Sequence, residues 1–319
     1  MFKPAIYHAA VTTTPPPAAG RAQPLRAAVV PLSLQTLLGD HPTTHALRCG
    51  RIASPLVPLA FADVAVPNKA FKRVVRDLEF DVAELALMTF LMARSRGVRL
   101  RLLPVVVFSR NPLPHLICDV ERRPVTPADL HGCRIGVRSY TTTTAVWIRA
   151  LLADQCGVRF DGAEWITLEE GHVAGVPDPS NVRRAGAGSD LLTMLRDGVI
   201  DAAIIDPVPA GQRFAAVVAD PEAVFRAWCE RHSARTVNHV VVVREALADD
   251  EPTMRELFGL FRESWNAAGA AIDLAATPLG LEANRRNLEV AIAVAEAEGL
   301  LARPLSVGEL VTDVLASLR

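Results

Sequence analysis

Residues 127–147 constrain the fold of this chain more than any other stretch. Arg134-Ile135-Gly136-Val137 forms a short apolar strand pattern, and a run of threonines, Thr141, Thr142, Thr143 and Thr144, stands where a helix to about Leu152 begins. A helix that starts in this way offers unpaired backbone N–H groups, hydroxyls and the positive end of its dipole to a small anion. The same threonines would also serve as ordinary N-caps without a ligand, and the pattern leaves both interpretations open.

Apolar strand patterns alternate with helical patterns through the middle of the chain. Strands are expected at residues 25–30, 100–108, 115–120, 165–168 and 200–205, with helices at 85–96 and 190–195. Such alternation is typical of an α/β fold with a largely parallel sheet. Residues 171–188 are rich in Gly, Pro and Arg and are expected to form a surface loop.

The pattern predicts two lobes. A flexible leader covers residues 1–24, lobe 1 is discontinuous and uses residues 25–112 and 207–319, and lobe 2 is inserted at residues 113–206. Two crossover segments would join the lobes. A ligand cleft is expected between them, because strand ends and helix N-termini from both lobes would face it.

Charge and cysteine usage exclude several classes of protein. The chain has 34 basic and 35 acidic residues, a balance that argues against a nucleic-acid surface built on phosphate contacts. No apolar run is long enough to span a bilayer and the start lacks a secretory signal, so a cytoplasmic protein with no membrane partner is expected. The five cysteines are scattered, and no metal-ligand spacing or phosphate loop is present, which predicts neither metal nor cofactor. A homo-oligomer is left open.

Six segments, taken in order, resemble the bacterial 4,5-dihydroxyphthalate decarboxylases. They are FDVAEL at residues 80–85, PADLHGCRIGV at 127–137, AVW at 145–147, DGVIDA at 197–202, LGLEANR at 279–285 and EGL at 298–300. The resemblance covers nearly everything after the leader. It implies a type 2 periplasmic-binding-protein fold, which that family uses for a non-oxidative aromatic decarboxylation and other relatives use to bind ligands for transport.

The chain departs from the family pattern at polar positions. Where the family has Tyr-Asp-Arg-Thr, this chain has Ser-Leu-Gln-Thr at residues 33–36, and where the family has Arg before His, Pro114 precedes His115. Asp206-Pro207 replaces Pro-Arg, and Arg138-Ser139-Tyr140 replaces Pro-Glu-Tyr. Two arginines are lost, and a dicarboxylate needs paired cationic donors. The resemblance therefore supports the fold more firmly than the substrate.

Three residues are candidates for acid–base chemistry: Glu84, His115 and His239. Decarboxylation of a hydroxylated aromatic acid needs a general acid for the ring carbon, and imidazole titrates near neutrality. Either histidine could deliver that proton, or could be a residue bonded to backbone near a crossover. Glu84 could accept a phenol proton or orient a histidine, or could only favour the dipole of the helix that follows it.

The candidate substrate-binding residues stand at strand ends and at the threonine-led helix start. Arg110 ends a strand and is a carboxylate clamp or a surface arginine, and Asp206 binds a ligand amine or hydroxyl or caps a turn. The other candidates are Arg138, Tyr140, Thr141, Thr142, Thr143 and Thr144.

The expected function is that of a decarboxylase-like lyase, free of metal and cofactor, whose partner is a small-molecule carboxylate of aromatic or related kind. Two alternatives remain open. One is a solute-binding protein of the same fold that recognises a small carboxylate, and the other is a biosynthetic enzyme of that fold with different chemistry.

Overall fold

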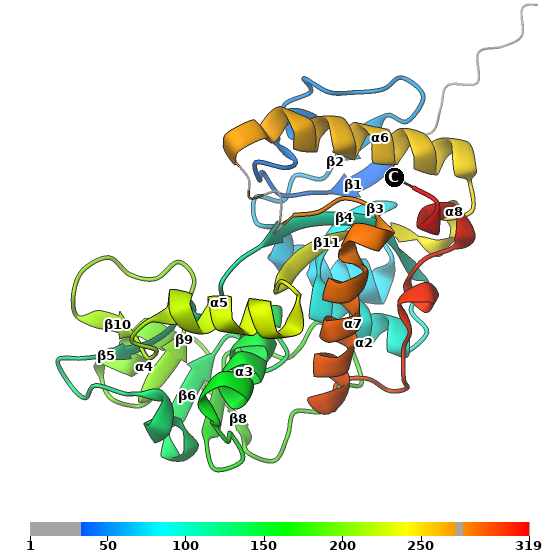
Figure 1. The fold of residues 1–319 in the computed structure, drawn as a ribbon. Helices are drawn as coiled ribbons and strands as arrows, with labels where there is room; N and C mark the ends of the chain where they lie inside the picture. The colour runs from blue at the N-terminus through cyan, green and yellow to red at the C-terminus, as the bar shows by residue number, and fades with distance from the viewer. Residues whose placement is uncertain (1–32, 272, 274–276, 319) are drawn as a thin grey trace, which may run out of the picture. The chain divides into compact units, whose positions relative to one another are not determined.

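Two mixed β-sheets with their helices make up the computed structural model (Figure 1). The structure describes residues 33–271, 273 and 277–318, all within one compact unit. The expected leader at residues 1–24 and the expected strand at 25–30 lie outside the described residues. In the described ranges, no helix has the length and apolar character needed to cross a membrane.

The first sheet has five strands in the order β2–β1–β3–β11–β4, which are Leu59–Phe61, Leu34–Leu37, Val82–Ala86, Val237–Arg244 and Leu100–Ser109. β1 runs parallel to β2 and β3, whereas β11 runs antiparallel to β3 and β4. Every residue of β3 is buried, and so is every residue of α2 (Leu87–Ser95), which packs against β3 and β11. The centre of this sheet is therefore a dry environment for any polar side chain it carries.

The second sheet has six strands in the order β10–β5–β9–β6–β7–β8, which are Phe214–Ala216, Leu116–Asp119, Ala202–Ile204, Arg134–Val137, Glu164–Thr167 and Val182–Arg184. β6 runs parallel to β7 and β9, and β5 runs antiparallel to β9 and β10. Residues 134–137 thus form the strand that the sequence predicts, at the interior of this sheet.

Two edge strands differ from the expectations. β8 lies inside the segment expected to be a surface loop, where Trp165 pairs with Val182. β10 pairs with β5, so this sheet includes residues beyond 206, which the expected division assigns to the other lobe. Both strands have only three residues, too few for an alternating pattern to stand out in the sequence.

Helix α3 (Thr143–Cys156) joins β6 to β7 of the second sheet and also packs against α2 beside the first sheet. It starts after Thr142, whose backbone is extended, and it ends at Gly157, whose φ of 66° is the left-handed conformation that favours glycine. Trp147 on this helix is fully buried and donates from Nε1 to the Val237 carbonyl of β11 at 2.9 Å. Trp147 therefore belongs to the core, and its truncation to Ala should cost about 3–5 kcal/mol of stability.

The remaining helices cover the sheets. They are α1 (His45–Arg48), α4 (Leu191–Arg196), α5 (Pro221–His232), α6 (Glu251–Ala268), α7 (Leu281–Ala297) and α8 (Asp313–Ala316). α6 and α8 contact β4, α7 contacts α2 and α3, and α5 contacts α3. Ahead of β3 the chain forms a 3₁₀ turn, Pro67–Ala70, and then a π-helical turn, Arg73–Asp77.

Candidate functional site

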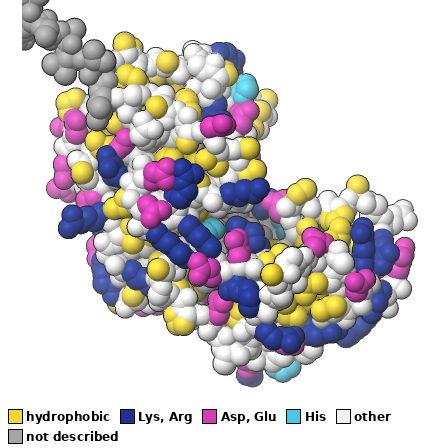
Figure 2. Space-filling model, turned by 180° about the vertical axis from the view of Figure 1, so that it is seen from behind, with side chains coloured by type: hydrophobic (Ala, Val, Ile, Leu, Met, Phe, Trp, Pro, Cys, Tyr) yellow, Lys and Arg dark blue, Asp and Glu magenta, His cyan; other side chains and the backbone are white. Residues whose placement is uncertain are grey.

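A pocket of about 470 Å³ is lined by residues from both sheets and from the start of α3. Figure 2 shows this face hollowed, with histidine visible in the hollow and charged side chains around it. Its polar lining consists of two arginines, three carboxylates, three histidines and several hydroxyl or amide residues. The charged and imidazole members are Arg110, Arg138, Glu84, Asp190, Asp206, His41, His172 and His239.

The strand register brings His239 to Glu84. His239 of β11 stands opposite Ala86 of β3, and Glu84 is two residues away on the same face of the sheet. Diagonal neighbours at that separation lie within reach of long side chains. The pairing of β11 with β4 is irregular on both sides of His239, and such irregularities re-aim side chains.

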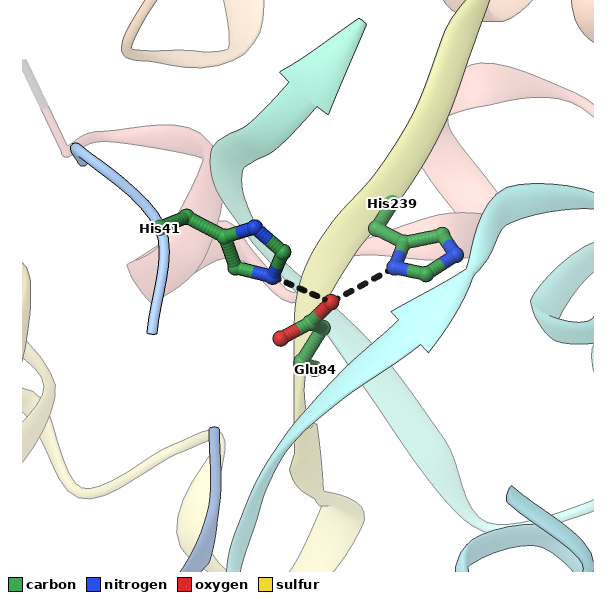
Figure 3. A group of neighbouring side chains, drawn as sticks. All are labelled: His41, Glu84 and His239. Carbon is green, nitrogen blue, oxygen red and sulfur yellow. Dashed lines mark hydrogen bonds and ion pairs between the residues drawn. The ribbon is translucent and has the colours of Figure 1, made fainter. Parts of the chain in front are cut away.

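A second histidine reaches the same carboxylate from the segment after β1. His41 Nε2 lies 2.9 Å and His239 Nδ1 lies 2.5 Å from Oε1 of Glu84, so both imidazoles meet one oxygen (Figure 3). The other oxygen, Oε2, accepts the backbone N–H of Gly39 at 2.7 Å. Any Cβ at position 39 would lie 2.6 Å from His41 Nε2, so only glycine fits beside this cluster.

Burial and hydrogen bonding act in opposite directions on Glu84, whose side chain is 1% exposed. Burial raises the pKa of its carboxyl, but the hydrogen bonds from His239 and His41 outweigh that effect and hold the pKa far below the ordinary range. Phe108 packs on both rings, with centroids 5.1 Å from His41 and 4.4 Å from His239. Glu84 is therefore an ionised carboxylate that holds two imidazoles in place.

Two ion pairs and several hydroxyls supply the other polar groups of the pocket. Arg138 lies 2.7 Å from Glu169, and Arg110 lies 2.8 Å from Asp206. Burial raises the pKa of Asp206, and the hydrogen bond from Arg110 more than reverses this and lowers it. Thr144 Oγ1 accepts from Arg110 at 3.4 Å, so the start of α3 lies against these charges.

The N-terminus of α3 faces the pocket through Thr142, Thr143 and Thr144. Thr142 makes no side-chain capping bond, and the Thr143 hydroxyl accepts the backbone N–H of Met88 at 3.1 Å. The Thr142 side chain thus leaves the N-terminus of α3 uncapped, while the next residue, Thr143, is hydrogen-bonded to α2. This arrangement offers backbone N–H groups and hydroxyls to an anion.

The pocket lining includes eight of the eleven residues that the sequence singles out. They are Glu84, His239, Arg110, Arg138, Thr142, Thr143, Thr144 and Asp206. The other three, His115, Tyr140 and Thr141, are not part of the lining.

His115 lies behind the pocket wall. Its Nδ1 is 3.2 Å from the Ile205 carbonyl and 3.7 Å from Asp206, and burial together with the nearby Arg110 charge lowers its pKa. This contact matches the interpretation of a histidine bonded to backbone near a crossover.

Tyr140 and Thr141 also face away from the pocket. The Tyr140 ring packs edge-on against Trp165 and under the Arg149 guanidinium, 4.0 Å from the ring centroid. Burial raises the pKa of its phenol. Thr141 is 4% exposed, and its hydroxyl lies so close to Gly171 that a Cβ there would be only 2.8 Å away. Both residues support the α3 start from behind.

The lining residues that the sequence did not single out include His41, His172 and Asn238. His41 lies in an irregular segment, and His172 lies in the stretch expected to be a surface loop, so neither position carries a periodic signal. Asn238 directly precedes His239 in a strand of valines, and this unusual polar pair was a usable signal. His172 is 6% exposed, and its Nδ1 lies 3.0 Å from the Thr89 hydroxyl.

Within the described ranges, His41, Glu84 and His239 are also the group whose ligand atoms, all within 4.8 Å of one another, could hold a metal ion. Two imidazoles and a carboxylate suit zinc or iron. Ligands of a zinc ion at about 2.0–2.1 Å lie roughly 3.4 Å apart, whereas His239 Nδ1 and Glu84 Oε1 are 2.5 Å apart. As they stand, these side chains are spaced for hydrogen bonds.

The fold places the chain among proteins with the periplasmic-binding-protein architecture, in agreement with the expected fold class. The aliphatic sulphonate binding protein SsuA of Escherichia coli superposes with a TM-score of 0.58 at 12% identity, covering 90% of this chain and 99% of that one. The alkanesulfonate-binding protein SsuA of Xanthomonas axonopodis pv. citri gives 0.54 at 12% identity, covering 89% and 99%. At such identities the likeness concerns the fold alone.

Two curated proteins resemble the chain in sequence, and both are 4,5-dihydroxyphthalate decarboxylases. The one from Comamonas testosteroni is 28% identical over 200 residues, 58% of this chain and 60% of that protein. The one from Pseudomonas putida is 29% identical over 153 residues, 45% of this chain and 59% of that protein. The matches thus span about three fifths of each relative's length, and no protein-family model matches. The chain is a divergent relative of these decarboxylases.

Proposed function

We propose that this chain is a decarboxylase-like lyase that removes CO₂ from a hydroxylated aromatic acid bound in the pocket. The observation that carries the proposal is the buried Glu84 carboxylate with two imidazoles on it, in the lining of a pocket that also holds arginines and a helix start. The similarity to two curated decarboxylases supports the same reaction class.

The acid would be held at the α3 start. Its carboxylate would accept from the hydroxyls of Thr142 and Thr144 and the backbone N–H of Thr144, and would lie near Arg138 and Arg110. The Arg110 guanidinium lies over the Phe108 ring, 5.7 Å from its centroid, and Phe108 packs on His41 and His239, so the bound acid would lie beside the Glu84 cluster. The ring would then extend toward the histidines, with Phe71 and Phe108 as its apolar neighbours in the lining.

His239 would supply the proton. Its Nδ1 is committed to Glu84, which fixes the ring and leaves Nε2 as the atom that exchanges a proton with a ligand. The proton adds to the ring carbon that bears the carboxylate. The ring–carboxyl bond then breaks, its electron pair returns to the ring, and CO₂ leaves. The net reaction consumes one proton and replaces the carboxylate with hydrogen.

His239 is favoured over His115 because of position. His239 lines the pocket and contacts Glu84, whereas His115 is bonded to the Ile205 carbonyl outside the lining. His41 shares the Glu84 oxygen and would support the charge of the cluster while His239 gives up its proton.

The test is direct. Purified protein is incubated with 4,5-dihydroxyphthalate and a panel of hydroxybenzoic acids, and CO₂ release and substrate loss are followed. We expect at least one acid to release CO₂ in step with its disappearance. Absence of CO₂ release from every acid, including those that stabilise the protein thermally, would refute the proposal.

A second candidate is a binding protein without chemistry, favoured by the fold shared with two sulfonate-binding proteins. A sulfonate or carboxylate would occupy the same helix start. Stoichiometric binding with no turnover would support this candidate. It would also remove the expectation of a cytoplasmic location, which cell fractionation can check separately.

A further inference from the structure

We infer that the acid this pocket takes is a monocarboxylate, and that Asp206 and Glu169 impose this limit by occupying both arginines of the pocket. The inference rests on the proposed function only in assuming that the ligand is an aromatic acid. It differs from the substrate named for the two curated relatives, which carries two carboxylates.

The permanent positive charges of the described lining are Arg110 and Arg138, and each already has an acidic partner. Asp206 lies 2.8 Å from Arg110, and Glu169 lies 2.7 Å from Arg138. A dicarboxylate is normally held by cationic donors that are free to form two-pronged bonds. Here a second ligand carboxylate would have to displace an internal one.

Two basic residues close to His172, Lys72 and Arg76, already have acidic partners as well. Lys72 lies 3.3 Å and Arg76 lies 2.9 Å from Glu170, and Arg76 also donates to the carbonyls of Gly171 and His172. Neither Lys72 nor Arg76 is part of the pocket lining.

Acidic groups in the lining outnumber the arginines. Glu84, Asp190 and Asp206 face two guanidiniums, and Asp190 is held at the start of α4 by the N–H and hydroxyl of Thr193. A like charge brought beside these groups is disfavoured, most strongly where the site is shielded from water. The two arginines alone therefore do not balance the acidic groups of the lining, and any ligand carboxylate depends on the histidines for a balancing charge.

The three histidines balance at most one ligand carboxylate. His41 and His239 share one ionised carboxylate, so even with both rings protonated the cluster has a single surplus positive charge. His172 adds none, because burial and then the charges of Arg138 and Lys72 lower its pKa to about 3. The pocket is thus matched to one anionic group.

Two pairs of acids test the inference, each differing by one carboxylate: 3,4-dihydroxybenzoate against 4,5-dihydroxyphthalate, and benzoate against phthalate. Calorimetric titration of the full chain at pH 7.5 should show the monocarboxylate of each pair binding at least about tenfold more tightly. Equal affinity, tighter binding of the dicarboxylate, or no binding of any of the four would overturn the inference.

Asp206→Asn frees Arg110, so the dicarboxylates should bind at least about fivefold more tightly. The ratio of the dicarboxylate Kd to the monocarboxylate Kd within each pair should then decrease. Glu169→Gln should do the same through Arg138, and stands in if the first variant does not fold. Asp178→Asn is the matched control, because Asp178 pairs with Arg184 outside the pocket and its loss should leave the ratio unchanged. An unchanged ratio of dissociation constants in both pocket variants would show that Asp206 and Glu169 do not set the preference for monocarboxylates.

These measurements concern binding alone. A preference for monocarboxylates without CO₂ release would refute the proposed decarboxylation and leave this inference standing. Turnover of a dicarboxylate, with no preference for monocarboxylates in binding, would support the decarboxylation and refute this inference.

Discussion

Glu84 and Asp206 are both carboxylates of one pocket, but their surroundings differ. The Glu84 side chain is 1% exposed and meets two imidazoles and a backbone N–H, whereas the Asp206 side chain is 51% exposed and meets one arginine, with His115 Nδ1 at 3.7 Å. A buried ion needs every partner it has, because water does not replace a lost one. An exposed ion pair is partly solvated and contributes about 0–1 kcal/mol. The buried Glu84 cluster is therefore suited to chemistry and the exposed ion pairs to recognition of the acid.

The largest expected effect comes from Glu84→Gln. The amide cannot hold an imidazolium by charge, so kcat should fall about 10²–10³-fold, within the range general acid–base groups contribute. KM should change much less. Steady-state CO₂ release measures both constants.

The matched control for this variant is Glu79→Gln, because Glu79 forms an exposed ion pair with Arg73 and is not part of the pocket lining. A loss of kcat in the Glu79 variant as large as that in the Glu84 variant would show that charge loss anywhere, rather than the cluster, is responsible.

A smaller effect, on KM rather than on kcat, is expected at the exposed ion pair of Arg138 with Glu169. Arg138→Gln removes a cation from the recognition side while the Glu84 cluster remains, so KM should rise about tenfold and kcat should stay within about threefold. Salt should weaken wild-type binding more than variant binding, because exposed charges are screened. A change confined to kcat would contradict the assignment of chemistry to the Glu84 cluster and of recognition to the ion pairs.

The smallest effect concerns stability and pH. The pKa of His172 is about 3 in the folded chain, below the ordinary value of 6.5. Between these values the unfolded chain binds a proton that the folded chain does not, so stability falls as pH decreases, by at most about 1.4 kcal/mol per pH unit. His172→Gln should flatten the pH dependence of the unfolding free energy between pH 6.5 and 5.

The Glu84 carboxyl can be separated from this effect by its pH window. Its folded pKa is lowered, so its stabilisation is complete above its ordinary value of 4.5 and is lost only below that pH. An unchanged slope in the His172 variant between pH 6.5 and 5 would contradict the burial of a neutral imidazole.

Local pattern was enough to predict much of the framework and part of the site. β6 and α3 form where an apolar strand and a threonine run predict them, and Glu84 and His239 were candidates because a charge and an imidazole stand in strongly apolar segments. Their mutual contact, however, depends on the pairing of β3 with β11, which are about 150 residues apart.

Two of the residues that the sequence missed, His41 and His172, have no local signal in the sequence. His41 joins the cluster because β1 lies beside β3, and His172 is buried against Thr89 of α2 although its segment is irregular. His115 looked equivalent to His239 in the sequence, and only the strand pairing separates them, since His115 is held at the Ile205 carbonyl. Long-range contacts of this kind are absent from any local window.

The most direct test of the central claim, that Glu84 acts through His239, is a double-mutant cycle on kcat. CO₂ release is measured for the wild type, Glu84→Gln, His239→Gln and the double variant, with the best acid of the panel. If the two residues act as a unit, the double variant loses no more than about twofold beyond the worse single variant. Losses that multiply would show independent roles and would contradict the claim.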